Sequence, residues 1–414
     1  MRLIKTDVEW SPRDPDFIRL NATIGMDRGG QEIHYWFDMR PELRDAISPS
    51  GNGWLTLMLP IACVIGEDIV IDRPVDRELV DNLNGLQMLW RSWYPALRSI
   101  DIHTEGGIVT RPTGTSENKT ISCFSGGVDS LFTYFRHDTE ITDAAEPAIH
   151  DLLNVGGFNT TLEDFDEMRR GLGPVAEDFG CRFVPILTNV RYSNQAIETA
   201  YSIEHWMEYL SHGGLLASVV HILGQRYGRL IIPAGHDFGC LIPWGSHPLS
   251  DPLYSSSDLA IVHDSCSFTR VDKTALIAEF PAALGALHVC WQDRHHGNCS
   301  KCPKCMRTMA TLDLLGAKQQ SHSFDWSNFS MEALSHVFLK DDNGLDYFIE
   351  IADRARQAGR LDIAAAADAS MRYSKRKQKA LGLVNSNPIS RSAWQMVRPL
   401  RDAILSNRRQ DSAA

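Results

Sequence analysis

The stretch Ile121-Ser-Cys-Phe-Ser-Gly-Gly-Val-Asp-Ser130 decides how the rest of this chain is interpreted. A strand-like run, Lys119–Phe124, leads into a turn with two adjacent glycines, and from Leu131 the sequence is apolar in a helical pattern. Glycines let backbone N–H groups approach an anion closely, and the N-terminus of a following helix adds partial positive charge. The stretch therefore predicts an anion-binding loop between a strand and a helix.

Each residue of this loop has an expected role. Ser125 and Ser130 can donate hydroxyl hydrogen bonds to an anion. Asp129 falls in the first helical turn, where the helix dipole stabilises a carboxylate that could hold Mg²⁺. The backbone N–H groups come from Gly126, Gly127 and Val128. The Gly-Lys-Ser/Thr ending of a Walker A loop is missing, so this loop is not expected to cradle β and γ phosphates in the Walker manner.

Strand-like and helix-like segments alternate around the loop, from about residue 119 to residue 316. After the first strand, three further runs have strand character: Asp151–Val155, Arg182–Leu187 and Leu230–Ala234. Helical patterns lie between them, at Glu163–Gly171 and Leu215–Tyr227. Strands separated by helices predict an α/β fold with a doubly wound parallel sheet that is covered on both faces.

The 414 residues suggest two to three domains. We expect an N-terminal α+β domain at 1–115, the loop-bearing domain at 116–320 and a helical C-terminal region at 321–414. Arg111–Asn118 reads as the first linker. Ile18–Gly25 and Glu32–Phe37 have strand composition. Leu55–Ile71 is expected to supply one or two buried strands, broken near Pro60 and Gly66, and a helix is expected to start at Asp76 as N-cap.

Composition and charge restrict the class of partner. The chain is 43% hydrophobic and 22% charged, as in globular proteins, and its net charge is −11. Its surface as a whole is therefore not expected to attract nucleic acid or an anionic membrane. Arg372–Ala414 is an exception, with ten Lys/Arg against two Asp/Glu, and fits either a solvated helical end or a polyanion-binding tail.

Neither a membrane span nor a secretion signal is expected. The longest strongly apolar run, Trp54–Ile65, is shorter than the ~20 residues that a spanning helix needs. Met1–Arg13 is charged and lacks the apolar core of a signal peptide. We therefore expect a cytoplasmic protein.

Four of the nine cysteines follow the spacing C-x8-C-x2-C-x2-C: Cys290, Cys299, Cys302 and Cys305. Four thiolates suit tetrahedral Zn²⁺, and a two-residue gap lets neighbouring sulfurs reach one ion through a tight turn. His295 and His296 could substitute as ligands, but four cysteines already complete the set. Two alternatives remain open, namely free buried cysteines and a redox or sulfur-carrying Cys302–Cys305 pair.

The loop resembles the SGGxDS signature of the PP-loop ATP pyrophosphatases, which include asparagine, GMP, NAD and argininosuccinate synthetases. All six positions of Ser125–Ser130 match. The resemblance implies an adenine nucleotide alpha-hydrolase-like fold in which the loop grips the pyrophosphate of ATP, with Mg²⁺, while a substrate oxygen attacks the α-phosphorus to give an adenylate.

Further site residues follow from this resemblance. Val155 and Gly156, at the end of the second strand, occupy the place where the family's backbone meets adenine. Gly235, His236 and Asp237 end the fourth strand, where ligands gather in open α/β sheets; His236 fits a structural histidine equally well. Arg270 and Lys273 lie at an expected helix start, where they could meet phosphate or carboxylate or form an exposed basic pair. Asp129, Ser130 and Lys273 are the candidate catalytic residues.

The loop and the cysteine spacing together resemble the 7-cyano-7-deazaguanine synthase family, over about residues 119–316. Phe268–Ala278 also resembles that family's helix before its zinc site. The resemblance implies that a small-molecule or protein carboxylate is adenylated and then attacked by a nitrogen nucleophile. The segment Asp237–Asp258 departs from that family, as do both flanking regions, which leave room for a homodimer or for partner subunits from the same operon.

Two other hypotheses keep the same fold. One is a tRNA-modifying sulfurtransferase that uses Cys302 and Cys305 as redox sulfurs. The other is a nucleotide-sensing, non-catalytic subunit of a larger assembly. Diverged members of the synthase group occur in antiviral defence operons and in biosynthetic clusters, so the resemblance leaves the pathway open.

Overall fold

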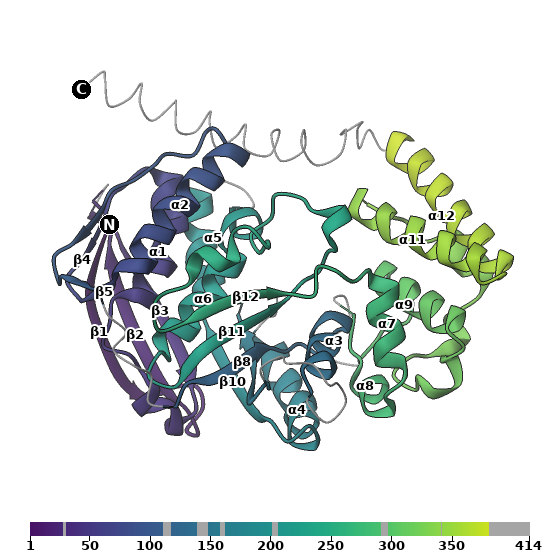
Figure 1. Ribbon diagram of the computed structural model, residues 1–414, viewed down its shortest axis with the longest axis horizontal. Coiled ribbons are helices and arrows are strands. Elements are labelled where there is room, and N and C mark those ends of the chain that lie inside the picture. Colours follow the sequence, from purple (N-terminus) through teal and green to yellow (C-terminus); the bar gives the residue numbers. More distant parts are fainter. Residues whose placement is uncertain are drawn as a thin grey trace.

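The computed structural model describes residues 1–27, 30–110, 117–138, 148–157, 162–200, 206–290, 297–340 and 342–380. A ten-stranded sheet runs through it in the order β12-β11-β8-β9-β10-β3-β2-β1-β4-β6 (Figure 1). Six of the nine neighbouring strand pairs are parallel. The α/β class expected from the sequence is confirmed, with a large and mostly parallel central sheet.

The parallel half of the sheet carries the predicted strands. These are β8 (Lys119–Cys123), β9 (Asp151–Gly156), β10 (Arg182–Thr188) and β11 (Tyr227–Pro233). A fifth strand of this half, β12 (Ala260–Asp264), was not predicted. The connecting helices are α3 (Val128–His137), α4 (Leu162–Asp178), α5 (Val190–Ala200) and α6 (His212–Ile222). Along β9, Leu152 and Leu153 belong to different apolar clusters, so this half is packed on both faces.

The antiparallel half comes from the N-terminal region. It consists of β1 (Arg2–Trp10), β2 (Ile18–Gly25) and β3 (Glu32–Met39), which confirms the two predicted strands. At the junction, Phe37 and Asp38 of β3 pair with Thr188 and Leu187 of β10, so residues on both sides of position 115 share one sheet. Independent folding of residues 1–115 stays a prediction, and most of the expected linker, 111–116, lies outside the described residues.

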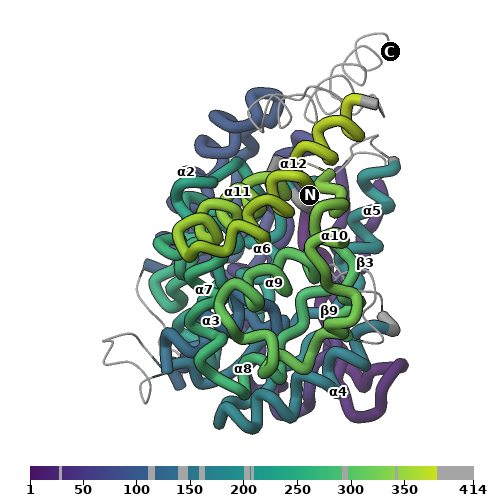
Figure 2. The backbone as a smooth tube through the Cα atoms, turned by 90° about the vertical axis from the view of Figure 1, so that its right-hand side faces the viewer, coloured from purple at the N-terminus to yellow at the C-terminus, as the bar shows by residue number. Residues whose placement is uncertain are grey.

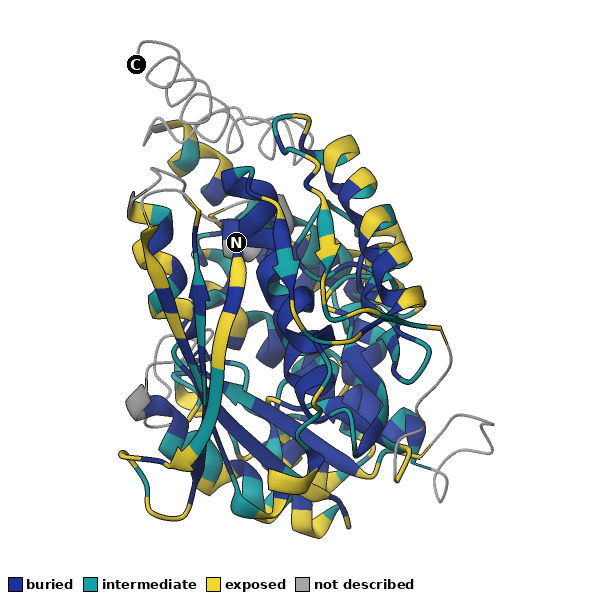
Figure 3. Cartoon of the chain, turned by 90° about the vertical axis from the view of Figure 1, so that its left-hand side faces the viewer, coloured by how far each residue is buried: buried dark blue, intermediate teal, exposed yellow. Residues whose placement is uncertain are grey.

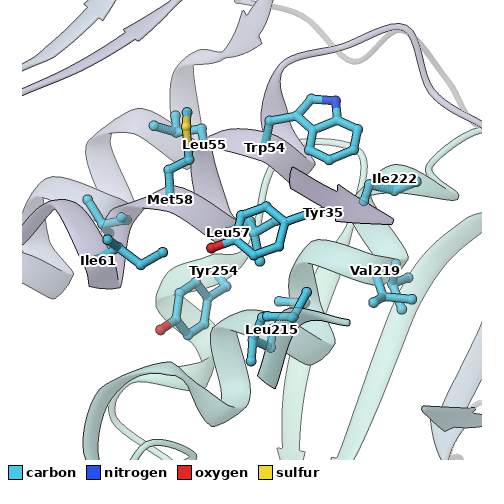
Figure 4. Packing of buried hydrophobic residues seen from close by; sticks show 14 of the residues in the cluster. Tyr35, Trp54, Leu55, Leu57, Met58, Ile61, Leu215, Val219, Ile222 and Tyr254 are labelled. Atoms are coloured by element: carbon cyan, nitrogen blue, oxygen red, sulfur yellow. The ribbon is translucent and has the colours of Figure 1, made fainter. Parts of the chain in front are cut away.

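The expectation of buried strands over Leu55–Ile71 was wrong. Most of that segment is helix α1 (Asn52–Ile65), and only β4 (Ile69–Ile71) is a strand. Every residue of α1 is buried, and a helix that is apolar on all sides shows no helical periodicity. Figure 4 shows side chains of α1 facing those of α6, with Tyr35 of β3 beside them. Pro60 lies inside the helix, and Gly66 ends it in the left-handed conformation at φ 72°.

Short elements complete this end of the molecule. The predicted helix after Asp76 is confirmed as α2 (Arg77–Trp93), whose N-cap Asp76 accepts a hydrogen bond from the Leu79 backbone. β5 (Val75–Asp76) pairs with β7 (Ile108–Val109), and β6 (Ile102–Thr104) forms the edge of the main sheet. Along the strand that starts at the N-terminus, only Leu3 is buried, and the other residues are exposed or half-buried (Figure 3).

The C-terminal region is helical in its described part, as expected. Its helices are α10 (Met331–Ser335), α11 (Asp342–Gln357) and α12 (Leu361–Ala380), and they are preceded in the chain by α7 (Arg270–Ala278), α8 (Pro281–Ala286) and α9 (Pro303–Leu314). They gather on one side of the molecule, with α12 outermost (Figure 2). Among the described residues, no helix is both long enough and apolar enough to cross a membrane.

Candidate functional site

The predicted strand–loop–helix is present, from β8 to α3. Gly126 has a φ of 71°, a left-handed conformation that suits glycine. Gly127 is the N-cap of α3 and offers no side chain to its N–H groups, so the helix N-terminus is available to another acceptor. The Ser130 hydroxyl donates to the Gly127 carbonyl at 3.1 Å and accepts from the Ser125 N–H at 3.3 Å. Ser130 therefore closes the loop on itself.

The loop opens onto a cavity of about 440 Å³. Most of the predicted site residues line this cavity: Ser125, Gly127, Val128, Asp129, Ser130, Val155, Gly235, His236 and Arg270. They come from the ends of β8, β9 and β11 and from the start of α7. This position is expected for a ligand site, because the carboxyl ends of parallel strands meet at one edge of the sheet.

The remaining predicted residues lie beside the cavity with other contacts. A Cβ at Gly156 would lie 2.2 Å from Phe165, so this glycine allows β9 and α4 to pack closely. Asp237 caps a short turn by accepting a hydrogen bond from the Gly239 N–H at 2.7 Å. The Gly126 carbonyl accepts from the His288 N–H at 2.8 Å, which ties the loop to the segment before the cysteine cluster.

Asp129 lies between a half-buried cation, Arg270, and a buried one, Lys273. Arg270 Nη2 is 3.0 Å from Oδ2 and Lys273 Nζ is 3.4 Å from Oδ1. Lys273 also donates to the Ala234 carbonyl at 2.7 Å and is 1% exposed, so the two cations are not an exposed basic pair. Burial would raise the pKa of Asp129, but Arg270, Lys273 and Arg307 outweigh it and lower the pKa below its usual value.

Arg307 is a residue that the sequence analysis missed. It lies on α9, lines the cavity, and places its guanidinium 3.9 Å from the ring centre of Tyr347. The Tyr347 hydroxyl donates to the Gly235 carbonyl at 3.0 Å, which fixes the ring against the end of β11. Burial, together with the neighbouring Arg270, lowers the pKa of Arg307 to about 10. Three cations thus face the single carboxylate of Asp129, which leaves a surplus of positive charge for an anion.

A second polar group lies elsewhere on the cavity wall. His263, at the end of β12, lines the cavity, and its Nδ1 is 2.7 Å from a carboxylate oxygen of Asp251. Asp251 is fully buried and also accepts from the Ser246 hydroxyl at 2.7 Å. Burial would lower the pKa of His263, but its hydrogen bond to Asp251 raises the pKa to about 9. This pair could not be predicted from the sequence, because neither residue belongs to a recognisable motif.

The four cysteines of the predicted metal site come together. The sulfurs of Cys290, Cys299, Cys302 and Cys305 all lie within 4.8 Å of one another. Two pairs, Cys290–Cys302 and Cys299–Cys305, are 3.9 Å apart. Four sulfurs bound at 2.3 Å to one tetrahedral ion would be about 3.8 Å apart. This cluster could therefore hold a metal ion such as zinc, whereas His295 and His296 lie outside the described residues.

Backbone groups support the cluster. The Cys302 N–H donates to the sulfur of Cys299 at 3.3 Å, and the Cys305 N–H donates to the sulfur of Cys302 at 3.4 Å. Hydrogen bonds from Cys305 lower the pKa of the Cys302 thiol to about 5, which favours the thiolate that a metal requires. Cys302 is also the N-cap of α9, so the cluster sets the start of the helix that carries Arg307.

Comparison with known proteins gives no match: no family model matches the chain, and no curated protein or solved structure matches it significantly. The class of this protein is therefore stated from its fold and site. The class is an α/β protein with a glycine loop at the carboxyl edge of its sheet, a cation-rich cavity and a four-cysteine cluster.

Proposed function

We propose that this chain is an ATP-dependent enzyme that adenylates a carboxylate substrate, releases pyrophosphate and then transfers the acyl group to a nitrogen nucleophile. The observation that carries the proposal is the meeting of the Ser125–Ser130 loop with three cations around one carboxylate. A capless helix N-terminus and surplus positive charge favour a polyphosphate ligand. That the bond between the α-phosphorus and pyrophosphate is the one broken is inferred from the resemblance to PP-loop enzymes.

Two bond exchanges make up the proposed reaction. A carboxylate oxygen forms a bond to the α-phosphorus as the bond from that phosphorus to the bridging oxygen of pyrophosphate breaks. A nitrogen then attacks the acyl carbon, loses a proton, and AMP leaves. The Gly127 end of the loop would bind pyrophosphate, while Arg270 and Arg307 would stabilise the charge that develops on the phosphates. The wall near His263 and Ser246 would receive the carboxylate substrate.

The donor sets fit the expected metals. Both oxygens of Asp129 face cations, yet each keeps a lone pair for Mg²⁺, a hard ion that prefers oxygen ligands. Magnesium would neutralise phosphate charge when bound. For the four-cysteine cluster we propose Zn²⁺, with a structural role, since four thiolates fill its coordination shell and leave no position for substrate.

Nucleotide binding tests the proposal directly. Isothermal titration of the full chain with Mg²⁺ and a non-hydrolysable ATP analogue should show binding, and Asp129→Ala should abolish it. Asp7→Ala, which removes a carboxylate of β1 on the antiparallel half, is the matched control and should bind as the wild type does. No uptake by metal-replete wild-type protein would refute the assignment.

Catalysis is tested separately by ATP–pyrophosphate exchange with pools of carboxylic acids and amines. Exchange that depends on an added carboxylate supports the ligase. Tight nucleotide binding without exchange in any pool would instead support a nucleotide-sensing subunit. Exchange together with labile sulfur on Cys302 or Cys305 and no bound zinc would support a sulfurtransferase.

A further inference from the structure

A second groove, separate from the glycine-loop cavity, includes Cys302 of the cysteine cluster in its lining, whereas the cavity includes Cys290. It has a volume of about 470 Å³ and runs between the start of α9 and the segment that follows α10. Lys301 lies on one wall, and His336, Phe338 and Lys340 lie on the other. Figure 2 shows α9, α10 and α12 on this side of the molecule.

The groove is fixed to the C-terminal half of α12. The Val337 carbonyl accepts hydrogen bonds from Ser370 and Ser374, and the Leu339 N–H donates to the Ser374 hydroxyl at 2.9 Å. Gln378 Nε2 donates to the Leu339 carbonyl at 2.8 Å. These contacts hold residues 337–340 against the last turns of α12, so the charges of that helix border the groove.

Those turns of α12 carry a dense positive charge. Between residues 372 and 380 there is no Asp or Glu, and five cations are exposed: Arg372, Lys375, Arg376, Lys377 and Lys379. Within the described structure, none of these five, nor Lys301 or Lys340, lies within 4.0 Å of a described carboxylate oxygen. The chain as a whole carries −11, so this cluster is a local reversal of its charge.

Aromatic rings lie among these cations. Lys377 Nζ is 4.6 Å from the ring centre of Phe338 and 3.3 Å from the hydroxyl of Tyr373. The rings of Tyr373 and His336 are 5.7 Å apart. An acidic protein segment would need only the cations, whereas unpaired bases stack on rings while their phosphates contact lysines. A duplex keeps its bases stacked inside and would not use the rings.

We propose that this groove and the basic end of α12 bind a single-stranded nucleic acid. The net charge of −11 is a sum over the whole chain, and a local basic patch of this kind is compatible with it. The site is independent of the proposed ATP chemistry, because it shares no described lining residue with the glycine-loop cavity. RNA and DNA present the same phosphates and bases to it, and the experiment separates them.

Fluorescence anisotropy with the full chain and labelled 12-nucleotide oligo-dT or oligo-U tests the proposal. For about four neutralised phosphates, raising salt from about 50 to 200 mM should weaken binding about 50-fold. The double variant Lys340→Gln/Lys377→Gln should lose at least tenfold in affinity at low salt. Phe338→Leu should lose several-fold with an unchanged salt slope, because it removes stacking and no charge. Lys5→Gln, an exposed lysine of β1, is the matched control.

Three results would overturn the proposal. They are no binding of either oligonucleotide at low salt, wild-type affinity in the double variant, and competition by poly-glutamate as effective as that by unlabelled oligonucleotide. The last result would assign the surface to an acidic protein. Metal content and nucleotide binding of the double variant should equal those of the wild type, which separates failure of this site from misfolding and from failure of the proposed function.

Discussion

The two halves of the ten-stranded sheet differ in where the loops that connect their strands lie. In the parallel half, β8 to β12, every carboxyl end points to the same edge, so the loops after β8, β9 and β11 meet in one cavity. In the antiparallel half, β1 to β3, successive connections fall at opposite edges. β9 is buried along almost its whole length, whereas β2 alternates between buried and half-buried residues. Strand direction therefore decides in which half loops from several strands can meet to form a binding site.

The two halves also differ in whether the charge of a carboxylate is balanced by its neighbours. Asp38 of β3 is matched in full, since both oxygens accept from Arg19, at 2.7 and 2.8 Å, and one also accepts from the Ser11 hydroxyl. In the parallel half, Asp129 faces more cations than it can neutralise. A matched pair stabilises the fold, and an unmatched excess of charge points to a ligand. Four measurements test this contrast.

The largest effect is expected from the cysteine cluster. Replacing Cys302 by serine removes one ligand while leaving a hydroxyl that can cap α9, and structural zinc sites contribute about 10–16 kcal/mol of apparent binding free energy. The variant should bind less than one metal ion per chain by elemental analysis and unfold at a much lower temperature. Cys181→Ser, a buried cysteine before β10, is the control and should keep the metal. Full metal content in Cys302→Ser would contradict the site.

The matched pair of the antiparallel half comes next. Asp38→Ala leaves the Arg19 guanidinium, whose side chain is 13% exposed, without its carboxylate. Breaking a buried pair on one side costs about 3–5 kcal/mol, measurable as the free energy of unfolding in urea. Nucleotide affinity of the folded fraction should not change, because this half contributes no residue to the described cavity lining. A large loss of affinity would show that the two halves are coupled.

His263 makes the stability of the parallel half depend on pH. Its pKa is raised to about 9, against about 6.5 in an unfolded chain, so the folded state binds this proton more tightly. The stabilisation is full below about pH 6.5 and is lost as the pH rises through 9. Its size is on the order of 3 kcal/mol. Urea unfolding at about pH 6 and pH 10 should show a larger decrease for the wild type than for His263→Gln, and equal decreases would exclude the pair.

The smallest effect is expected at Arg307. Arg307→Ala should weaken binding of Mg²⁺–ATP by about 10- to 100-fold, which corresponds to about 1.4–2.8 kcal/mol. Arg307→Lys should recover part of the loss, because it restores the charge but not the planar contact with Tyr347. Arg356→Lys, an exposed arginine of α11, is the control. Unchanged affinity in Arg307→Ala would mean that the excess charge does not serve the nucleotide.

The fold could be predicted where a local pattern specified it. The glycine loop, the strands at Asp151 and Arg182 and the cap at Asp76 each depend on residues close together in sequence. Prediction failed for α1, because a helix buried on all sides has the same apolar composition as a buried strand. β12 was missed because its five residues include His263 and Asp264, which break the apolar run.

The site divides in the same way. The glycine loop and the four-cysteine spacing could be identified from the sequence alone, because two adjacent glycines before a helix and a repeated two-residue gap are local chemical requirements. Only the tertiary structure placed Arg307 against Tyr347, buried Lys273 beside Asp129 and paired His263 with Asp251. Lys273 and Asp129 are 144 positions apart in the chain, and no local sequence pattern could predict that they lie in contact. The packing of α3 against α7 brings them together, so the charge around Asp129 is a consequence of the tertiary fold.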